Sequence, residues 1–277
     1  MSKWAGAIMK EYPNFNIVGE EWSYNPMIVN YWQQGKHNFD GYQSNLPTVM
    51  DFPMQKAIGD GIREKETWDT GLTKIYQGLA NDFAYFNPNN IMIFIDNHDM
   101  DRVFTQMDHN VAYTQMAIGL SFVLPRIPQM YYGTEVLFEN TAQKGEHGLI
   151  RSDFWGGWKG DKKNAFTQEN LSKDEKAMQN FVKTVLNYRK NSKAIQQGKT
   201  VHFAPQNGVY VLFRTYEDET VVCILNKNEK PYTLDLQRFE EMRLNNKTLC
   251  NIITNEEVTW NKQLTFDKAG IYIFTTK

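Results

Sequence analysis

The sequence predicts an α/β protein with a parallel sheet up to about residue 198, followed by a small antiparallel β-sandwich domain over residues 199–277. Two observations support this prediction. Before about residue 135, short apolar runs alternate with helical segments, which is typical of βα units with a parallel sheet. After residue 199, short alternating or apolar runs are separated by turn residues, which is typical of antiparallel strands.

Four short apolar runs are the strand candidates of the first domain. They are FNIVGE (15–20), LPTVMDF (46–52), IMIFIDN (91–97) and PQMYYG (128–133). Each run is short enough for a strand, and helical patterns lie between successive runs. We therefore expect the four strands to follow one another in a parallel sheet.

Helical periodicity is found in several segments of the first domain. A short helix is predicted before Pro13, and a nearly all-apolar helix over 111–124 stops at Pro125. A further helix is predicted over 71–86, and its apolar face comprises Leu72, Ile75, Tyr76, Leu79 and Phe83. The clearest helix begins after Ser172, which forms a capping box with Glu175.

The second domain contains five apolar or alternating runs. They are VHFA (201–204), GVYVLFRTY (208–216), ETVVCILN (219–226), YTLDL (232–236) and GIYIFTT (270–276). Turn residues such as Asn207-Gly208 separate them, so we expect antiparallel strands with a domain boundary near residue 198.

Composition excludes several classes of function. The formal net charge of −2 over 277 residues gives no electrostatic case for binding nucleic acid or an anionic membrane, and no run is long enough to span a bilayer. Cys223 and Cys250 do not make a disulfide framework, and no Cys/His cluster has zinc spacing. We expect two buried thiols, no metal site and no cofactor.

Polar side chains follow each predicted strand. The first strand ends in Glu20, Glu21 and Trp22, and the second ends near Asp51. The third and fourth strands end in Asn97, His98, Asp99, Asp101, Arg102, Tyr132 and Glu135. Because the carboxyl ends of parallel strands share one edge, these groups are expected to converge, and paired carboxylates there suggest acid/base or glycosidic chemistry.

A less specific interpretation applies to each of these residues taken singly. A strand-end carboxylate is often only the N-cap of the following helix, and Asp51, which precedes Phe-Pro, is a candidate for that role. His98 alone is more often a hydrogen-bonded structural group than a catalyst. The functional prediction therefore depends on the combination.

Three of these segments resemble consecutive signature segments of the α-amylase family of retaining glycoside hydrolases. They are IVGEEW (17–22), FIDNHDMDR (94–102) and IPQMYYGTE (127–135). A fourth segment, GLIRSDFWGGWKGDKKNAFT (148–167), resembles the neopullulanase and cyclomaltodextrinase branch. The resemblance covers most of the chain. It implies the last four βα units of a TIM-type (β/α)8 barrel in residues 1–198, followed by the sandwich, with an α-glucan oligosaccharide or polysaccharide as substrate.

The resemblance also implies roles for individual residues. Glu20 corresponds to the general acid/base, a carboxyl that must be protonated to assist the leaving glycosidic oxygen, and Asp99 corresponds to the transition-state stabiliser. The remaining predicted residues bind substrate or shape the site: Asn97, His98, Trp22, Arg102, Arg151 and Asp153. For the last two, a salt bridge within a loop is the alternative.

Part of the family pattern is absent from this sequence. No G-x-R-x-D segment, which carries the family's nucleophile, precedes Glu20, and only four barrel strands are predicted where a complete barrel has eight and usually ~250 residues. The carboxylates that could replace the nucleophile are Glu21, Asp51, Asp96 and Asp101, and none matches its motif. The sequence therefore predicts a C-terminal fragment that is inactive alone.

Two further expectations follow. An open half barrel exposes strand edges, so we expect a homodimer or pairing with an N-terminal half. The alternatives to a hydrolase are a non-catalytic glucan-binding or assembly module and a folded remnant with neither activity. The sequence does not distinguish starch, pullulan and cyclomaltodextrins as substrates, and it leaves the cellular compartment open.

Overall fold

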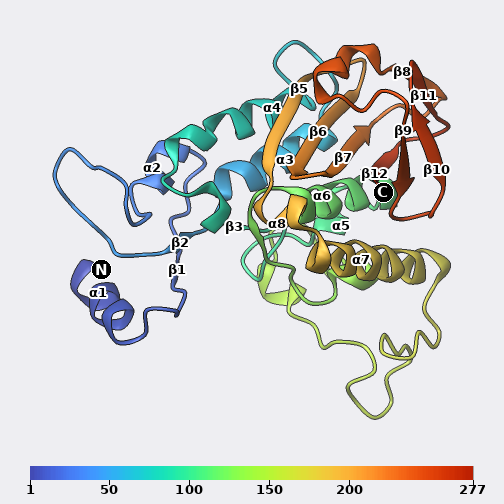
Figure 1. Ribbon diagram of the computed structural model, residues 1–277. Helices are drawn as coiled ribbons and strands as arrows, with labels where there is room; N and C mark the ends of the chain where they lie inside the picture. Colours follow the sequence, from blue (N-terminus) through green and yellow to red (C-terminus); the bar gives the residue numbers. More distant parts are fainter. Residues whose placement is uncertain (277) are drawn as a thin grey trace.

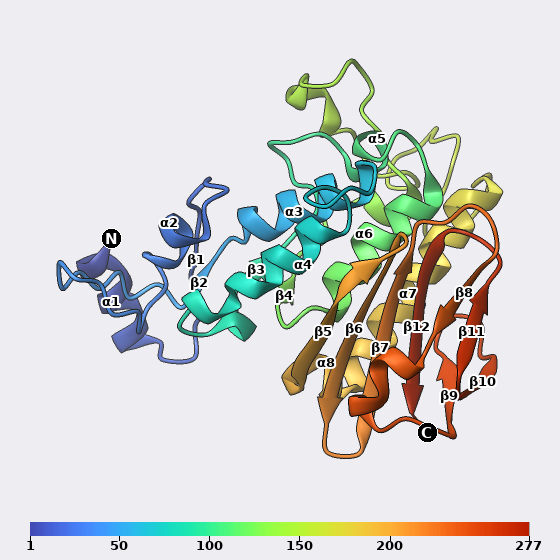
Figure 2. The ribbon, with the colours of Figure 1, turned by 90° about the horizontal axis from the view of Figure 1, so that it is seen from above.

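The computed structural model describes residues 1–276 (Figure 1). In both ribbon views, α1 (Ser2–Glu11) and the first strands lie at one end of the molecule, and an antiparallel sheet lies at the other (Figures 1 and 2). Helices of the central part of the chain lie between them. Among the described residues, no helix is long and apolar enough to cross a membrane.

Four short parallel strands follow one another in chain order. They are β1 (Val18–Gly19), β2 (Thr48–Val49), β3 (Met92–Ile93) and β4 (Ile127–Pro128). β1 pairs with β2, β3 pairs with β4, and a parallel bridge between Met50 and Met92 joins the two pairs. All four predicted strand regions therefore contain a strand, but each strand has 2 residues, and the fourth begins one residue earlier than predicted.

The strand register divides the parallel sheet into a closed face and a partly open face. Val49 and Ile93 are completely buried, and Ile93 belongs to the main core with residues of the surrounding helices. On the opposite face, Val18 is 40% exposed and Ile127 is 38% exposed. Parallel sheets are ordinarily covered on both faces, so the open face is unusual. Glu20 lies two residues beyond Val18 and thus on the same side.

Within the described residues, seven further α-helices lie between β1 and the C-terminal strands along the chain. They are α2 (Pro26–Asn30), α3 (Phe52–Arg63), α4 (Thr73–Ala80), α5 (Val103–Gln106), α6 (Val111–Val123), α7 (Lys173–Asn191) and α8 (Lys193–Gln197). The predicted capping box is confirmed, because Ser172 and Glu175 bond reciprocally at the start of α7. The helix predicted over 71–86 is shorter than expected. α4 ends at Ala80 and a 3-10 turn (Asn81–Ala84) follows, which leaves Phe83 84% exposed rather than on the buried face.

The C-terminal part forms a six-stranded antiparallel sheet and a two-stranded ribbon. The sheet has the order β10-β9-β12-β7-β6-β5, and the ribbon pairs β11 with β8. The strands are β5 (Lys199–Gln206), β6 (Val209–Tyr216), β7 (Glu219–Asn226), β8 (Tyr232–Asp235), β9 (Lys247–Asn251), β10 (Glu257–Trp260), β11 (Gln263–Phe266) and β12 (Gly270–Thr276). An apolar cluster that includes Phe213, Leu234 and Phe266 joins the sheet to the ribbon.

The main hydrophobic core crosses residue 198. It contains Ile58 of α3, Leu120 of α6 and Val185 of α7 together with Leu225 and Ile273 of the sheet. One face of the sheet is therefore covered by helices, and burial of these side chains is the main force that holds the two parts together.

Of the two thiols expected to be buried, Cys223 is buried and Cys250 is only partly buried, and both are free. The expectation was thus correct for the former only.

Candidate active site

The strand pairing brings the carboxyl ends of β1, β2 and β3 to one rim. The backbone N–H of Met50 donates to the carbonyl oxygen of Gly19 at 3.1 Å, and the N–H of Asp51 donates to that of Met92 at 2.9 Å. Glu20 directly follows Gly19, and its side chain is exposed at this rim. Because parallel strands present their carboxyl ends on the same side, the segment after Met92 reaches the same rim.

Adjacent Glu20 and Glu21 have different surroundings. Glu21 accepts a hydrogen bond from the indole nitrogen of Trp32 at 2.8 Å, which ties its carboxylate to the residues after α2. Successive side chains on extended backbone point to opposite sides. Glu21 is thus engaged with Trp32, whereas Glu20 is exposed at the rim.

Trp22 is held against the start of α3. Its ring stacks on Phe52 with centroids 4.8 Å apart and an interplanar angle of 23°. Phe52 is completely buried and packs edge-on against Phe94, which follows β3. Trp22 itself remains 45% exposed. The aromatic chain thus fixes a partly exposed indole beside the segment that carries Asn97 to Arg102.

The Asn97–Asp99 turn is ordered by its own side chains. Asn97 is 5% exposed, and its Oδ1 accepts a hydrogen bond from the backbone N–H of Asp99 at 2.8 Å. His98 Nε2 lies 3.2 Å from Asp99 Oδ2. His98 and Asp99 are both substantially exposed, so this buried asparagine presents them at the surface.

Arg151 closes the other side of this turn. Its terminal nitrogen donates to Asp99 Oδ1 at 2.8 Å, and its Nε donates to the carbonyl oxygen of His98 at 3.1 Å. The loop salt bridge considered as the alternative for Arg151 is therefore present. Asp153 is exposed two residues further along the same loop, so it shares the neighbourhood of Arg151.

Arg102 is completely buried, whereas most of the predicted site residues are exposed. Its guanidinium donates twice to the carbonyl oxygen of Ile150, at 2.7 and 3.1 Å, and also to that of Tyr132. The ring of Tyr131 lies 3.9 Å from the guanidinium carbon. Arg102 therefore shapes the site by fixing the loop before Arg151, and direct contact with substrate stays a prediction.

Asp96, like Asp51, is a completely or almost completely buried carboxyl group near the rim. Asp96 accepts hydrogen bonds from the backbone N–H of Val103 at 2.8 Å and from the Thr134 hydroxyl. Burial raises the pKa of Asp96 to about 6, against the opposing effect of the hydrogen bond from Val103 and the charge of Arg102. In the sequence, only the position of Asp96 within an apolar strand segment indicated that it would be a buried hydrogen-bond acceptor.

Asp51 has the structural role proposed as its alternative. Its side chain accepts from the N–H of Met54 at the start of α3, and its other oxygen accepts from Arg126 Nε at 2.7 Å. Burial raises the pKa of Asp51, and the charge of Arg126 opposes this effect. Asp51 is thus an N-cap and a partner of a buried arginine.

The fourth strand end provides a carboxyl group that the sequence did not single out as a site residue. Burial raises the pKa of Glu135, against hydrogen bonds from its own backbone N–H and that of Gly133. Its Oε2 is buried without a hydrogen-bond partner among the described residues. Across residues 1–276, no group of three or more His, Cys, Asp or Glu side chains could hold a metal ion.

The rim segments from β1 and β3 meet around one pocket. Trp22 and Asp99 both line it, although the three α-helices α2, α3 and α4 lie between them in the sequence, and the pocket has a volume of about 290 Å³. Asp101 and His147 also line this pocket. The structure therefore brings an aromatic side chain from the first signature segment and the carboxylate of the second to the same pocket.

Comparison with known proteins shows which family this chain resembles. Residues 200–275 match the family model of the cyclo-malto-dextrinase C-terminal domain. An alpha-amylase of Niallia circulans is 26% identical over 219 residues, which cover 77% of this chain and 37% of that protein. A cyclomaltodextrin glucanotransferase of Paenibacillus macerans is 24% identical over 180 residues, or 65% of this chain and 22% of that protein. These matches support a C-terminal portion of an α-amylase family protein.

Solved structures of α-amylase family proteins share the fold. The alpha-amylase of Geobacillus thermoleovorans, complexed with acarbose, superimposes with a TM-score of 0.78 at 21% identity, over 100% of this chain and 56% of that one. An Anoxybacillus alpha-amylase gives a TM-score of 0.73 at 20% identity, over 99% of this chain and 55% of that one. The chain thus spans little more than half of these structures and less than half of the curated relatives.

Proposed function

We propose that this chain carries the acid/base and the transition-state stabiliser of a retaining α-glucan hydrolase. The bonds cleaved are α-1,4-glucosidic bonds, with α-1,6 bonds as a second candidate. The observation that carries the proposal is the meeting of the Glu20–Trp22 and Asn97–Asp99 segments at one rim, where Trp22 and Asp99 line the same pocket. Names of relatives, amylases and cyclomaltodextrin glucanotransferases, support the class of reaction.

Each catalytic role has a physical requirement. Glu20 protonates the leaving glycosidic oxygen and later activates water, and Asp99 stabilises the oxocarbenium-like transition state. His98 binds sugar hydroxyls, and Asn97 orders the turn that carries His98 and Asp99 and contributes to substrate binding. Arg151 and Asp153 add substrate contacts along the neighbouring loop. Trp22 supplies an apolar face, and Arg102 holds the loop in place.

Hydrolysis also needs a nucleophile, which we propose comes from a complementary polypeptide segment. Retention requires a second carboxylate ~5–5.5 Å from the acid. The four candidates within this chain are otherwise engaged: Glu21 with Trp32, Asp51 with Arg126, Asp96 with Val103 and Thr134, and Asp101 with Asn140 and Gly145. We therefore propose that the chain alone is inactive.

We propose two domains for this chain and a partner that covers the open edges of the first. Residues 1–198 form the last four βα units of a (β/α)8 barrel and residues 199–277 a separate β-sandwich domain, although a shared core joins them. The four parallel strands in chain order, with Val18 and Ile127 exposed on one face, support an open barrel closed by a homodimer or an N-terminal half. A monomer by light scattering at all concentrations would contradict the homodimer. The cyclo-malto-dextrinase domain model supports the neopullulanase/cyclomaltodextrinase branch.

A second candidate function is a glucan-binding module without hydrolysis. It is favoured by the engagement of all four candidate nucleophiles with other groups of the chain. An ordered rim without a free nucleophile would bind glucan and leave it uncleaved. In that case the open face serves assembly.

The test is reducing-sugar release from pullulan, soluble starch and β-cyclodextrin, together with calorimetric binding of β-cyclodextrin. We expect no release and measurable binding that weakens in Asp99→Asn. Release that vanishes in Glu20→Gln but persists in Glu21→Gln would overturn the need for an external nucleophile. Absence of both release and binding would overturn the α-glucan proposal.

A further inference from the structure

A second set of polar side chains adjoins the rim on the side of α3. The pocket that contains Trp22 and Asp99 extends over α3, where Lys56, Asp60 and Arg63 line it. None of these three residues belongs to a signature segment quoted above. We call this extension the α3 pocket.

One wall of the α3 pocket is aromatic. Trp22 Nε1 donates to the hydroxyl of Tyr24 at 3.3 Å, and the two rings are 45% and 50% exposed. Lys56 Nζ lies 5.2 Å from the centroid of the Tyr24 ring. The stack of Trp22 on Phe52 anchors this wall to the core. A partly exposed aromatic pair fixed in this way offers an apolar surface to a ring-shaped ligand.

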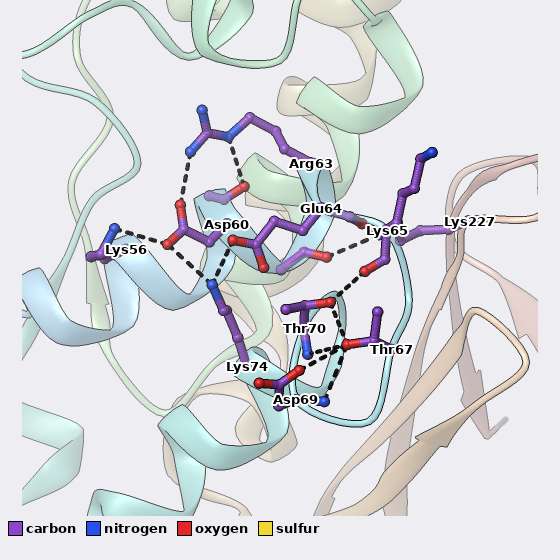
Figure 3. Close-up of polar contacts among 12 residues, drawn as sticks. Lys56, Asp60, Arg63, Glu64, Lys65, Thr67, Asp69, Thr70, Lys74 and Lys227 are labelled. Carbon is purple, nitrogen blue, oxygen red and sulfur yellow. Dashed lines mark hydrogen bonds and ion pairs between the residues drawn. The ribbon is translucent and has the colours of Figure 1, made fainter.

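Asp60, which lines the α3 pocket, is the centre of an ion-pair network (Figure 3). Asp60 accepts from Lys56 at 2.8 Å and from Arg63 at 2.8 Å, and Lys74 of α4 approaches it at 3.6 Å. Burial would raise the pKa of Asp60, but these cations outweigh it and lower the pKa. Asp60 is therefore an ionised acceptor in a fixed position at neutral pH.

The far end of α3 is anchored independently. Lys227, which directly follows β7, donates to the carbonyl oxygens of Gly61 and Glu64 and to Glu66 Oε1. Its side chain is only 8% exposed. The helix that carries Lys56 and Asp60 is thus fixed at both ends, since Asp51 caps its start. A binding surface on a rigid element needs little ordering when ligand arrives.

Two further residues that line the pocket, Asp101 and His147, also have polar partners. Asp101 accepts from Asn140 Nδ2 at 2.6 Å and from the backbone N–H of Gly145 at 2.9 Å, and His147 Nε2 lies 3.6 Å away. The charged groups of the pocket are two cations, Lys56 and Arg63, and three carboxylates, Asp60, Asp99 and Asp101. With His147 neutral, two minus three leaves a net charge of −1. This balance disfavours a phosphorylated ligand and suits a neutral one with many hydroxyl groups.

We propose that the α3 pocket binds a sugar unit of an α-glucan next to the unit held at Asp99, with Tyr24, Lys56 and Asp60 as specificity-determining residues. Tyr24 and Trp22 pack against the ring, while Lys56 donates to a hydroxyl and Asp60 accepts from another. This inference rests on the proposed function, because it adds a contact to the same glucan. A solvent-exposed ion-pair network without a ligand is the competing explanation.

The structure offers a matched pair of variants to separate these explanations. Lys56 and Lys74 both pair with Asp60, but only Lys56 lines the pocket. Lys56→Met and Lys74→Met each remove one cation from Asp60, and only the former removes a group from the pocket. Thermal unfolding of both variants checks that they fold.

The experiment is an NMR titration of the full chain and each variant with maltotriose, and separately with glucose 6-phosphate. We expect Lys56→Met and Tyr24→Ala to weaken maltotriose binding about tenfold, and Lys74→Met to change it less than about twofold. Equal effects of the two lysine variants, or no effect of Lys56→Met and Tyr24→Ala, would overturn the α3 pocket while leaving glucan binding at the rim intact. Tighter binding of glucose 6-phosphate than of maltotriose would overturn the choice of a neutral sugar. If the unmodified chain binds no maltotriose, the α3 pocket and the glucan proposal both fail.

Discussion

Arg151 binds Asp99 across 52 positions of sequence, donating from its terminal nitrogen to Oδ1 at 2.8 Å. The same side chain donates to the carbonyl oxygen of His98 at 3.1 Å, so it fixes both the backbone and the carboxylate of the His98-Asp99 turn. Asn97 holds the turn from the other side. The orientation of Asp99 is therefore determined by a loop as well as by the strand that precedes it.

Arg151→Ala is expected to weaken glucan binding more than it weakens the fold. The Arg151 and Asp99 side chains are 50% and 40% exposed, and an ion pair between exposed groups contributes at most about 1 kcal/mol. We expect urea denaturation to show a loss of that size or less, and calorimetry to show weaker β-cyclodextrin binding. Lys144→Ala, which removes an exposed ion pair with Asp108, is the control. A large loss of stability in Arg151→Ala with unchanged binding would assign it a structural role.

Arg102→Leu is expected to destabilise the protein strongly. The substitution leaves the carbonyl oxygens of Ile150 and Tyr132 without their buried donor. Each unsatisfied group costs about 1–3 kcal/mol, so the free energy of unfolding should fall by roughly 2–6 kcal/mol for the two groups. Urea denaturation measures this loss, with the exposed Arg63→Leu as control. Limited proteolysis should also cut faster within residues 140–152, and an unchanged rate would contradict the loop-fixing role.

Asp96→Asn is expected to alter the pH dependence of stability. Burial raises the pKa of Asp96 to about 6, whereas an aspartate in an unfolded chain titrates near ~3.9. The native state therefore holds the proton more tightly, and stability falls as the pH rises from about 4 to about 6, by up to about 3 kcal/mol. The difference in unfolding free energy between pH 4 and pH 6 should shrink in Asp96→Asn. The exposed Asp69→Asn should leave it unchanged, and equal slopes in all three proteins would refute this origin.

Lys227→Met is expected to loosen the connection between the sheet and α3. Lys227 is the donor to Gly61 and Glu64 at the C-terminal end of that helix, where a cation is also favoured by the helix dipole. We expect a loss of about 1–3 kcal/mol in unfolding free energy and faster hydrogen exchange over residues 61–72. Lys230→Met, which changes an exposed lysine nearby, should have neither effect. Unchanged exchange in Lys227→Met would show that the core alone fixes α3.

The elements that the sequence did not predict correctly have irregular burial along the chain. β9, β10 and β11 were not predicted, because each has few buried apolar side chains: Leu249, Trp260 and Phe266 are the well-buried apolar residues in their strands. Phe83 fits a helical face by spacing but is 84% exposed, since the α-helix ends at Ala80. Local patterns specify elements well only where burial is regular along the chain.

Some features of this protein are determined by the sequence alone, because their partners are close along the chain. The capping box of Ser172 and Glu175, the N-cap role of Asp51 and the strand-end positions of Glu20 and Asp99 follow from local spacing. Tertiary structure alone decides the burial of Arg102 beneath Ile150, the pairing of Arg151 with Asp99 and the contact of Lys227 with α3, whose partners lie 48, 52 and 163 positions apart. A charged side chain is equally compatible with solvent, substrate or a buried carbonyl oxygen, and only the packing of distant segments determines which of these it meets.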